Sequence, residues 1–419
     1  MKKIVFISLA AILAVGLLTP SSPAAEPIVV GSPTSFYTAS GWGALEYSKI
    51  ALEEINAKGG VNVGGVKRPL KIVTADTRGG EPGTPVHEAL MAYEKMILEE
   101  KPDVINIGAF RSEVLMAVMD LVAKYKIPHM GGIAQTPKFR DRVIENPEKY
   151  KYLFRCTTHS HLLVKFYLAQ LHDYLKEKYG LTKIIFMAQD SLWNTAVVET
   201  LREYCIKTGW QDLGYSKYAG GATDFSPFLI KAKKGGAQVI VNSFDVPLGA
   251  GNFVKQLVGM KLPAILTGFS MPLASPAAWE TMGPGIEYAL QVEFPAGCTV
   301  PLKKRPGSVE ILEKYKKMFN RLPMSSSTIS GYMGMYILAD AMERAGTLDA
   351  DALVAALEKT DLMLIPGRCR FDEGHQLIYG LDPKESALSV IVQWVKPGVR
   401  VAVYPPAVAD AEIQMPKMK

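Results

Sequence analysis

An arginine and a serine stand side by side where a buried strand is followed by a helix. The apolar run Val104–Gly108 predicts the strand, and an amphipathic stretch at Val114–Tyr125 predicts the helix. Ser112 stands where it could cap that helix, and its hydroxyl group and the nearby amides would suit a carboxylate. The guanidinium of Arg111 could hold the same group through two parallel hydrogen bonds, although a surface arginine is the plainer alternative. The pair indicates a site for a small anion.

Other residues that could bind a ligand lie in loops that follow predicted strands. In open α/β sheets, ligands bind outside the carboxyl ends of the strands. Three loops of the first half of the chain lie there, at Ser32–Trp42, Ala109–Glu113 and Ile133–Pro137. The second half brings Asp190–Trp193, Phe244–Asp245 and Phe269–Ser270. Each ring alone is more often part of a core, but together the rings at these strand ends could bury an apolar ligand body while dipoles hold its polar end.

The elements that must position these loops alternate regularly. Short Val/Ile-rich runs, such as Ile28–Ser32 and Leu70–Ala75, are followed by amphipathic stretches, such as Ala44–Ala57 and Val86–Glu99. The strands are continuously apolar, as expected when helices cover both faces of a parallel sheet. After a segment near Tyr152–His161 the same alternation starts again. The sequence therefore predicts an α/β protein with two doubly wound parallel-sheet lobes.

The C-terminal part of the chain is too short for a third domain. Its helices, predicted between Val309 and Glu358, would return to the first lobe, and its strands at Leu388–Val395 and Arg400–Val403 would join the second. The chain would then cross between the lobes about three times, which makes a hinge. The predicted limits are listed here: residues 1–25 signal peptide, residues 26–154 and 295–360 lobe 1, residues 155–294 and 361–405 lobe 2, and residues 406–419 a C-terminal tail.

The first residues indicate export. Lys2 and Lys3 precede the apolar run Ile4–Leu18, and the small-residue stretch Ser21–Ala25 follows. This pattern is typical of a secretory signal peptide, cleaved here after Ala24 or Ala25. The apolar run is shorter than the ~20 residues that cross a bilayer. We expect a soluble, periplasmic mature protein that is not embedded in a membrane.

Composition and motifs exclude several classes of function. The net charge is +6, with 47 basic and 41 acidic residues, so nucleic acid is not an expected partner. The chain has no Gly-Lys dipeptide, no His-Glu-x-x-His and no Gly-x-Ser-x-Gly, so phosphate-loop, zincin and α/β-hydrolase chemistry are not expected and no cofactor is expected. His159 and His161 have no neighbouring cysteine or acid, so no metal site is expected.

The cysteines do not form a metal or redox motif. Cys156 and Cys205 are expected to be small buried hydrophobic residues. Cys298 and Cys369 both lie in Gly/Pro-flanked segments, so a disulfide between them could form in an oxidising compartment.

Segments spread over nearly all of the chain resemble one family. They are Ile28-Val-Val-Gly31, Ala51–Gly60, Asp103–Gly108, Ile127–Gly132, Ala222–Ser226, Ser330–Tyr332 and Phe371–Gly374. Their order and spacing resemble the leucine/isoleucine/valine-binding proteins, which are type I periplasmic solute receptors of ABC transporters. The resemblance implies a two-lobed clamp that closes on an amino acid, docks on the permease subunits of an ABC transporter and does no covalent chemistry.

The resemblance also implies where the ligand binds. The carboxylate would be held by Ser112 and by the loop Ala134-Gln135-Thr136, and the second lobe would contribute Trp193 and Asp245. The complete predicted set is Tyr37, Trp42, Phe110, Arg111, Ser112, Ala134, Gln135, Thr136, Trp193, Asp245 and Phe269.

Two departures from the family pattern leave the ligand open. The acids that hold the amino group in the family fall on Ser160 and Phe269, and Arg111 occupies a position that is usually small. Because a buried ammonium group without an acid is costly, either Asp245 or Asp190 supplies the charge, or the ligand is an aromatic or short-chain carboxylic acid or amide. Such a receptor could serve uptake or signalling.

Overall fold

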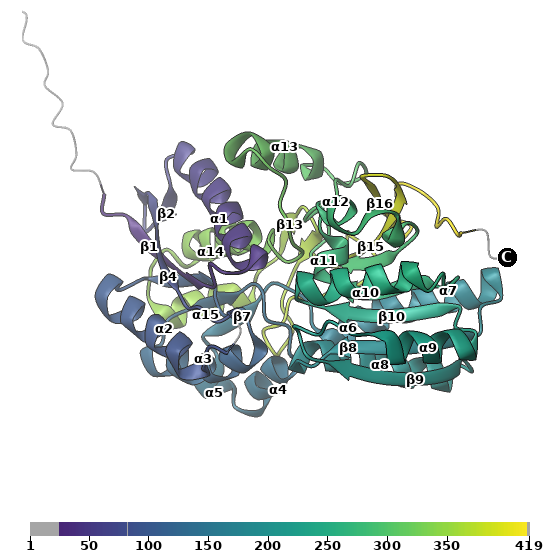
Figure 1. Ribbon diagram of the computed structural model, residues 1–419. Helices are drawn as coiled ribbons and strands as arrows, with labels where there is room; N and C mark the ends of the chain where they lie inside the picture. Colours follow the sequence, from purple (N-terminus) through teal and green to yellow (C-terminus); the bar gives the residue numbers. More distant parts are fainter. Residues whose placement is uncertain (1–24, 82, 417–419) are drawn as a thin grey trace, which may run out of the picture.

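The computed structural model describes residues 25–81 and 83–416, which form two lobes lying side by side (Figure 1). The predicted signal peptide, apart from Ala25, falls outside the described residues. Each lobe is built on its own sheet, and helices cover the sheets.

The first lobe contains a five-stranded parallel sheet in the order β4-β1-β5-β6-β7. Its strands are β1 (Ile28–Thr34), β4 (Leu70–Asp76), β5 (Val104–Ile107), β6 (His129–Gly131) and β7 (Leu153–Arg155), with a small hairpin of β2 (Val61–Val63) and β3 (Val66–Arg68) beside them. Its helices are α1 (Ala39–Ala57), α2 (Val86–Glu100), α3 (Ser112–Tyr125), α4 (Lys138–Glu145), α5 (Pro147–Tyr150), α13 (Ser308–Phe319), α14 (Ser330–Ala345) and α15 (Ala350–Glu358). Helices α1 and α14 pack together on one side of the sheet, and α2 and α3 pack together on the other (Figure 1).

The second lobe contains a seven-stranded sheet in the order β16-β15-β12-β11-β10-β8-β9. Its strands are β8 (Lys183–Gln189), β9 (Gln211–Tyr218), β10 (Val239–Phe244), β11 (Ile265–Ser270), β12 (Leu290–Glu293), β15 (Val390–Lys396) and β16 (Val399–Tyr404). Its helices are α6 (Ser160–Leu163), a π-helical turn η1 (Val164–Leu168), α7 (Ala169–Tyr179), α8 (Leu192–Lys207), α9 (Ser226–Gly235), α10 (Pro247–Gly259), α11 (Met271–Ala274), α12 (Ala278–Met282) and a 3-10 turn η2 (Gly283–Ile286). Strands β9 to β12 are parallel, while β15 and β16 add an antiparallel edge.

The predicted fold class is confirmed. Strands β5 and β10 are buried along their whole length, because helices cover both faces of each sheet. The antiparallel edge of the second sheet is an addition that hydrophobic runs alone did not specify.

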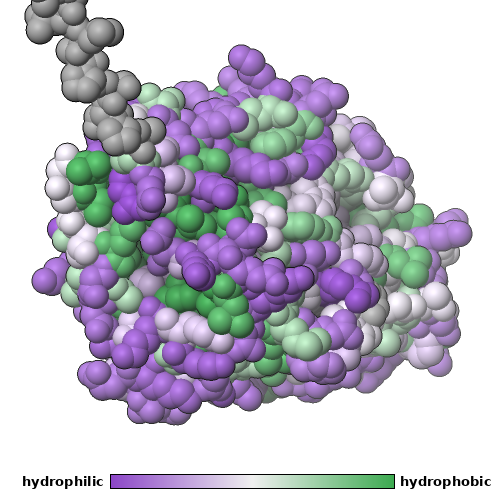
Figure 2. Space-filling view, turned by 90° about the vertical axis from the view of Figure 1, so that its left-hand side faces the viewer, coloured by the Kyte–Doolittle hydropathy of each residue, from purple (hydrophilic) through white to green (hydrophobic). Residues whose placement is uncertain are grey.

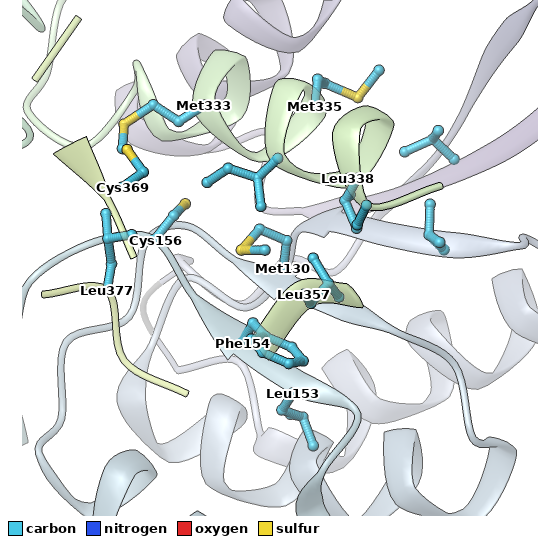
Figure 3. Packing of buried hydrophobic residues seen from close by; sticks show 14 of the residues in the cluster. Met130, Leu153, Phe154, Cys156, Met333, Met335, Leu338, Leu357, Cys369 and Leu377 are labelled. Atoms are coloured by element: carbon cyan, nitrogen blue, oxygen red, sulfur yellow. The ribbon is translucent and has the colours of Figure 1, made fainter. Parts of the chain in front are cut away.

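The core of the first lobe contains late parts of the chain. Side chains of α14 and α15 pack onto β6 and β7, and Cys369 and Leu377 lie beside Cys156 and Phe154 in the same cluster (Figure 3). The short hairpin of β13 (Leu362–Leu364) and β14 (Gly367–Cys369) belongs to it as well.

These contacts bear on the predicted limits of the lobes, which stay a prediction. Residues 362–387 were predicted with the second lobe, yet most of their apolar side chains pack into the core of the first, while Leu381 packs against the core of the second. Contacts therefore favour a later crossing, just before β15. Val408, Ile413 and Met415, predicted in a tail, pack against the second lobe.

The disulfide that the sequence allowed between Cys298 and Cys369 is absent from the structure. All four cysteines are free and buried, including Cys156 and Cys205, which were expected to be buried.

The outer face of the first lobe, which faces the viewer in Figure 2, mixes hydrophilic and hydrophobic side chains. Among the described residues, none of the helices combines the length and the apolar character needed to cross a membrane.

Candidate ligand-binding site

A cavity of about 540 Å³ lies between the two lobes. The first lobe lines it with the start of α1 and the loop after β5, and the second with the loops after β10 and β11. Of the predicted site residues, Tyr37, Trp42, Phe110 and Asp245 line this cavity. The carboxyl ends of both sheets therefore face one shared space, as expected for open α/β sheets.

The wall of the cavity is largely apolar. Trp42 lies with one face against the guanidinium of Arg321, 4.0 Å from the ring centroid, and Tyr37 is 62% exposed at the mouth. Met271, Met282 and Met324 complete the wall. Methionine adapts its shape to a guest, so this half of the cavity suits an apolar ligand body; the three methionines were missed by the sequence analysis.

The first lobe contributes polar groups that have no partner in the described part of the chain. The Ser112 hydroxyl and the Gln135 side-chain oxygen are buried without a hydrogen bond. The backbone N–H groups of Ala134, Gln135 and Thr136 find no acceptor among the residues that the structure describes. Buried polar groups are normally paired, so this cluster is suited to accept a hydrogen-bonding guest.

Ser112 does not cap its helix, contrary to the prediction. Arg111 occupies the cap position of α3, Ser112 is the first helical residue, and no side chain caps this helix end. The hydroxyl group of Ser112 is therefore not used by the helix end, but Ser112 is not among the residues that line the cavity.

The first crossing between the lobes adds three more unpartnered groups. The Thr157 hydroxyl, His159 Nδ1 and the Ser160 hydroxyl are buried without a partner, and the Ser160 amide donates to the Gln135 carbonyl at 3.4 Å. Burial first, and then the charge of Arg155, lowers the pKa of His159 to about 2. The imidazole is thus neutral. Only the polar character of this segment was visible in the sequence.

The second lobe contributes a carboxyl group with one free oxygen. Asp245 Oδ2 accepts hydrogen bonds from Trp193 Nε1 at 2.9 Å and from Asn194 Nδ2 at 2.7 Å, while Oδ1 is buried without a partner. Burial raises the pKa of Asp245 to about 7, although the two donors oppose that shift. Glu113, on the first lobe, also raises this pKa, so its negative charge acts across the cleft.

The remaining predicted residues divide into those near this carboxyl group and those directed elsewhere. The edge of Trp193 lies against Phe269, with the ring centroids 4.7 Å apart, so both accompany Asp245. Arg111 does not line the cavity: its Nη2 donates to the Thr84 carbonyl at 2.7 Å, although its Nε is buried without a partner. A contact of Arg111 with the ligand stays a prediction. Asp190 is exposed.

Metal binding gains no support from the structure. The rings of His159 and His161 lie edge to face, 5.8 Å apart. Within residues 25–81 and 83–416, no three His, Cys, Asp or Glu side chains form a group that could hold an ion.

Two lobes that enclose a cavity at their strand ends define a ligand receptor. Residues 28–382 match the family model described as periplasmic binding protein, and the chain belongs to this family. The family consists of binding proteins, so the predicted class of function is confirmed.

A relative named Leu/Ile/Val-binding protein homolog 7, from Brucella suis biovar 1 (strain 1330), is 26% identical and covers 98% of this chain and 99% of its own. The resemblance seen in the sequence is therefore confirmed.

Solved structures show the same fold. The substrate-binding protein LivJ of the branched-chain amino acid transporter of Streptococcus pneumoniae, in complex with isoleucine, has a TM-score of 0.72 at 19% identity, over 90% of this chain and 100% of that one. A solute-binding protein of an ABC transporter from R. palustris, in complex with benzoate, has a TM-score of 0.71 at 17% identity, over 94% of this chain and 100% of that one.

Proposed function

We propose that this protein is the periplasmic receptor of an ABC transporter of the branched-chain amino acid type. It captures a small carboxylate between its lobes and delivers it to the permease subunits. The observation that carries the proposal is the apolar cavity between the lobes, which Asp245 lines with a free carboxyl oxygen, together with the unpartnered polar groups of Ser112 and Gln135 on the first lobe. The names of the relatives point to the same use.

The ligand that fits best is an amino acid with an apolar side chain. Ser112 and the amides of the Ala134–Thr136 loop would bind its carboxylate. Asp245 Oδ1 would then accept from its ammonium group and replace the acids that the family places at Ser160 and Phe269. The methionines and Trp42 would enclose its side chain.

An aromatic carboxylic acid is a second candidate. The rings of Trp42 and Phe110 and the methionines form a largely apolar wall, and one structural neighbour holds benzoate. Such a ligand brings no ammonium group, so Asp245 would bind it in the protonated form, which a pKa of about 7 allows.

Binding would proceed by closure of the clamp. A ligand that contacts both lobes favours the closed state by its higher affinity for that state. Micromolar affinity needs about −8 kcal/mol, and two or three charge-assisted hydrogen bonds at ~1.5–3 kcal/mol each, with one buried apolar body, supply it after ordering costs.

Mass spectrometry of small molecules carried through native purification, followed by calorimetry with amino acids, aromatic acids and aliphatic acids, tests this proposal. We expect micromolar binding of one of these classes and release of the ligand unchanged. Turnover of the ligand would show an enzyme instead. Loss of a response with unimpaired uptake after gene deletion would show a signalling receptor.

Export has its own test. We expect N-terminal sequencing of the exported protein to begin at Ala25 or Glu26, since cleavage is proposed after Ala24 or Ala25. A mature protein that begins at Met1 would contradict the signal peptide.

A further inference from the structure

Arg155 is a buried cation without an acid beside it. It is the last residue of β7, where the chain leaves the first sheet, and it is 1% exposed. Among the described residues, no carboxylate lies within ion-pair distance of its guanidinium, although other buried arginines such as Arg400 have one. Burying an unpaired charge is costly, so its hydrogen bonds must explain its presence.

Those hydrogen bonds hold the Ala134–Thr136 loop, to which the proposed function assigns the carboxylate of the ligand. Arg155 Nη1 donates to the Thr136 carbonyl at 2.7 Å and to the Ala134 carbonyl at 3.3 Å. In a planar trans peptide, the N–H group points opposite to the carbonyl. Because the Ala134 carbonyl turns toward Arg155, the Gln135 N–H turns away from it and has no acceptor among residues 25–81 and 83–416.

The same guanidinium joins this loop to the first chain crossing and to the segment that leads to the last. Arg155 Nε donates to Gln376 Oε1 at 2.7 Å, and Gln376 Nε2 donates to the Thr157 carbonyl at 2.6 Å. The backbone of Arg155 also pairs with His375 and Leu377 at 2.9 Å each. Thr157 lies in the first crossing, and Gln376 lies in the segment that leads to the last.

We propose that Arg155 is a positioning residue for ligand binding. It fixes the peptide groups of the Ala134–Thr136 loop in the orientation that presents donors to a carboxylate, and it links that loop to the crossings that move when the lobes close. This inference rests on the proposed function. The charge of Arg155 also acts in the cleft, because it is the second cause, after burial, of the lowered pKa of His159.

The test compares R155M and R155K with a matched control, R305M. Arg305 is half-buried and also donates to two backbone carbonyls, those of Leu364 and Ile365 at 2.9 Å each, which do not line the cavity between the lobes. The measurements are calorimetric affinities for isoleucine and benzoate, melting temperatures, and crystal structures of the ligand-free proteins. Q376M, which breaks the link to Thr157, serves as a second variant if R155M does not fold.

We expect R155M to lower affinity at least 30-fold and R155K, which keeps the charge, to recover part of that loss. R305M lowers the melting temperature but leaves affinity within about twofold. In crystals of R155M the Ala134–Gln135 peptide is expected to turn, and Q376M is expected to weaken binding by about three- to tenfold.

If the role of Arg155 is purely structural, affinity and melting temperature should fall together in R155M and R305M alike. That result, or an unchanged peptide orientation in R155M, overturns the inference. If neither probe binds the wild type, the proposed ligand classes fail, while the peptide orientation still decides the role of Arg155.

Discussion

The two halves of the cleft satisfy their polar groups in opposite ways. On the first lobe, the Ser112 hydroxyl is buried without a partner, and a buried cation, Arg155, holds the Ala134–Thr136 loop, whose backbone N–H groups find no acceptor among the described residues. On the second lobe, the carboxyl group of Asp245 is held by Trp193 and Asn194 and keeps a single oxygen free. The first half presents the Ser112 hydroxyl and the backbone amides of residues 134–136 as donors, whereas the second presents one acceptor oxygen of Asp245.

This difference indicates which charged group of the ligand binds to which lobe. A carboxylate is stabilised where unpartnered donors converge, and an ammonium group is stabilised beside Asp245. An amino acid satisfies both halves at once. An acid without an ammonium group satisfies only the first half and must meet Asp245 as a protonated carboxyl group. Substitutions on the two halves therefore separate the two candidates.

The largest effect is expected from D245N. If the ligand is an amino acid, loss of the acid leaves its ammonium group unpaired, and affinity falls by about 2–4 kcal/mol, or roughly 30- to 1,000-fold. If the ligand is an aromatic acid, D245N leaves affinity unchanged or raises it. Calorimetry with isoleucine and benzoate measures both outcomes, and D190N, which changes an exposed acid, is the control.

S112A tests the other half and should weaken both kinds of ligand. A hydroxyl that donates to a carboxylate contributes about 1.5–3 kcal/mol, so affinity should fall roughly 10- to 100-fold. Because the Ser112 hydroxyl has no hydrogen-bond partner among the described residues, the melting temperature of the ligand-free protein should hardly change. S226A, at the start of a helix of the second lobe that does not line the cavity, is the control. Unchanged affinity in S112A would remove the first half from the carboxylate site.

The sequence was sufficient for the fold because its signals are local and repeated. Continuous apolar runs and amphipathic stretches predicted β4, β5 and α3 to within a few residues. Residues 362–387 were harder, since short strands and turns do not reveal which of two cores they join; their place depends on contacts such as that of Leu377 with the first core.

The site was predicted only in part, because its geometry depends on residues far apart in the sequence. Loops after strands indicated Trp42, Phe110 and Asp245, which line the cavity. Arg111 followed the same pattern, yet its Nη2 donates to Thr84. No pattern indicated Arg155, whose role depends on a loop about twenty residues earlier and on Gln376, more than two hundred residues later.

The ratio of the affinities for the two ligands is expected to change by about tenfold per pH unit. The pKa of Asp245 is raised from its usual ~3.9 to about 7, so the folded protein keeps this proton up to neutral pH. An amino acid needs the ionised form, so its affinity should fall as pH drops from 7 to 6; an aromatic acid should bind more tightly over the same range. Calorimetry at pH 6, 7 and 8 distinguishes them, and D245N should remove either slope.

The stability of the ligand-free protein should also depend on pH through the carboxyl group of Asp245. Because the pKa of Asp245 is higher in the folded than in the unfolded chain, the folded state binds more protons between about pH 4 and 7. This group therefore makes the protein less stable as pH rises through that window. Denaturant unfolding of the wild type and D245N should show the difference, and equal pH slopes for the two proteins would contradict a raised pKa.

The smallest effect is expected from W193F, which keeps an aromatic ring against Phe269 but removes the donor to Asp245. The hydrogen bond from Trp193 opposes the rise in the pKa of Asp245, so its loss should raise that pKa further. Binding of an amino acid should weaken about three- to tenfold at pH 7, a loss of about 1 kcal/mol, and recover at higher pH because Asp245 becomes ionised there. A loss that stays constant from pH 7 to 9 would show that Trp193 acts by contact with the ligand and not through Asp245.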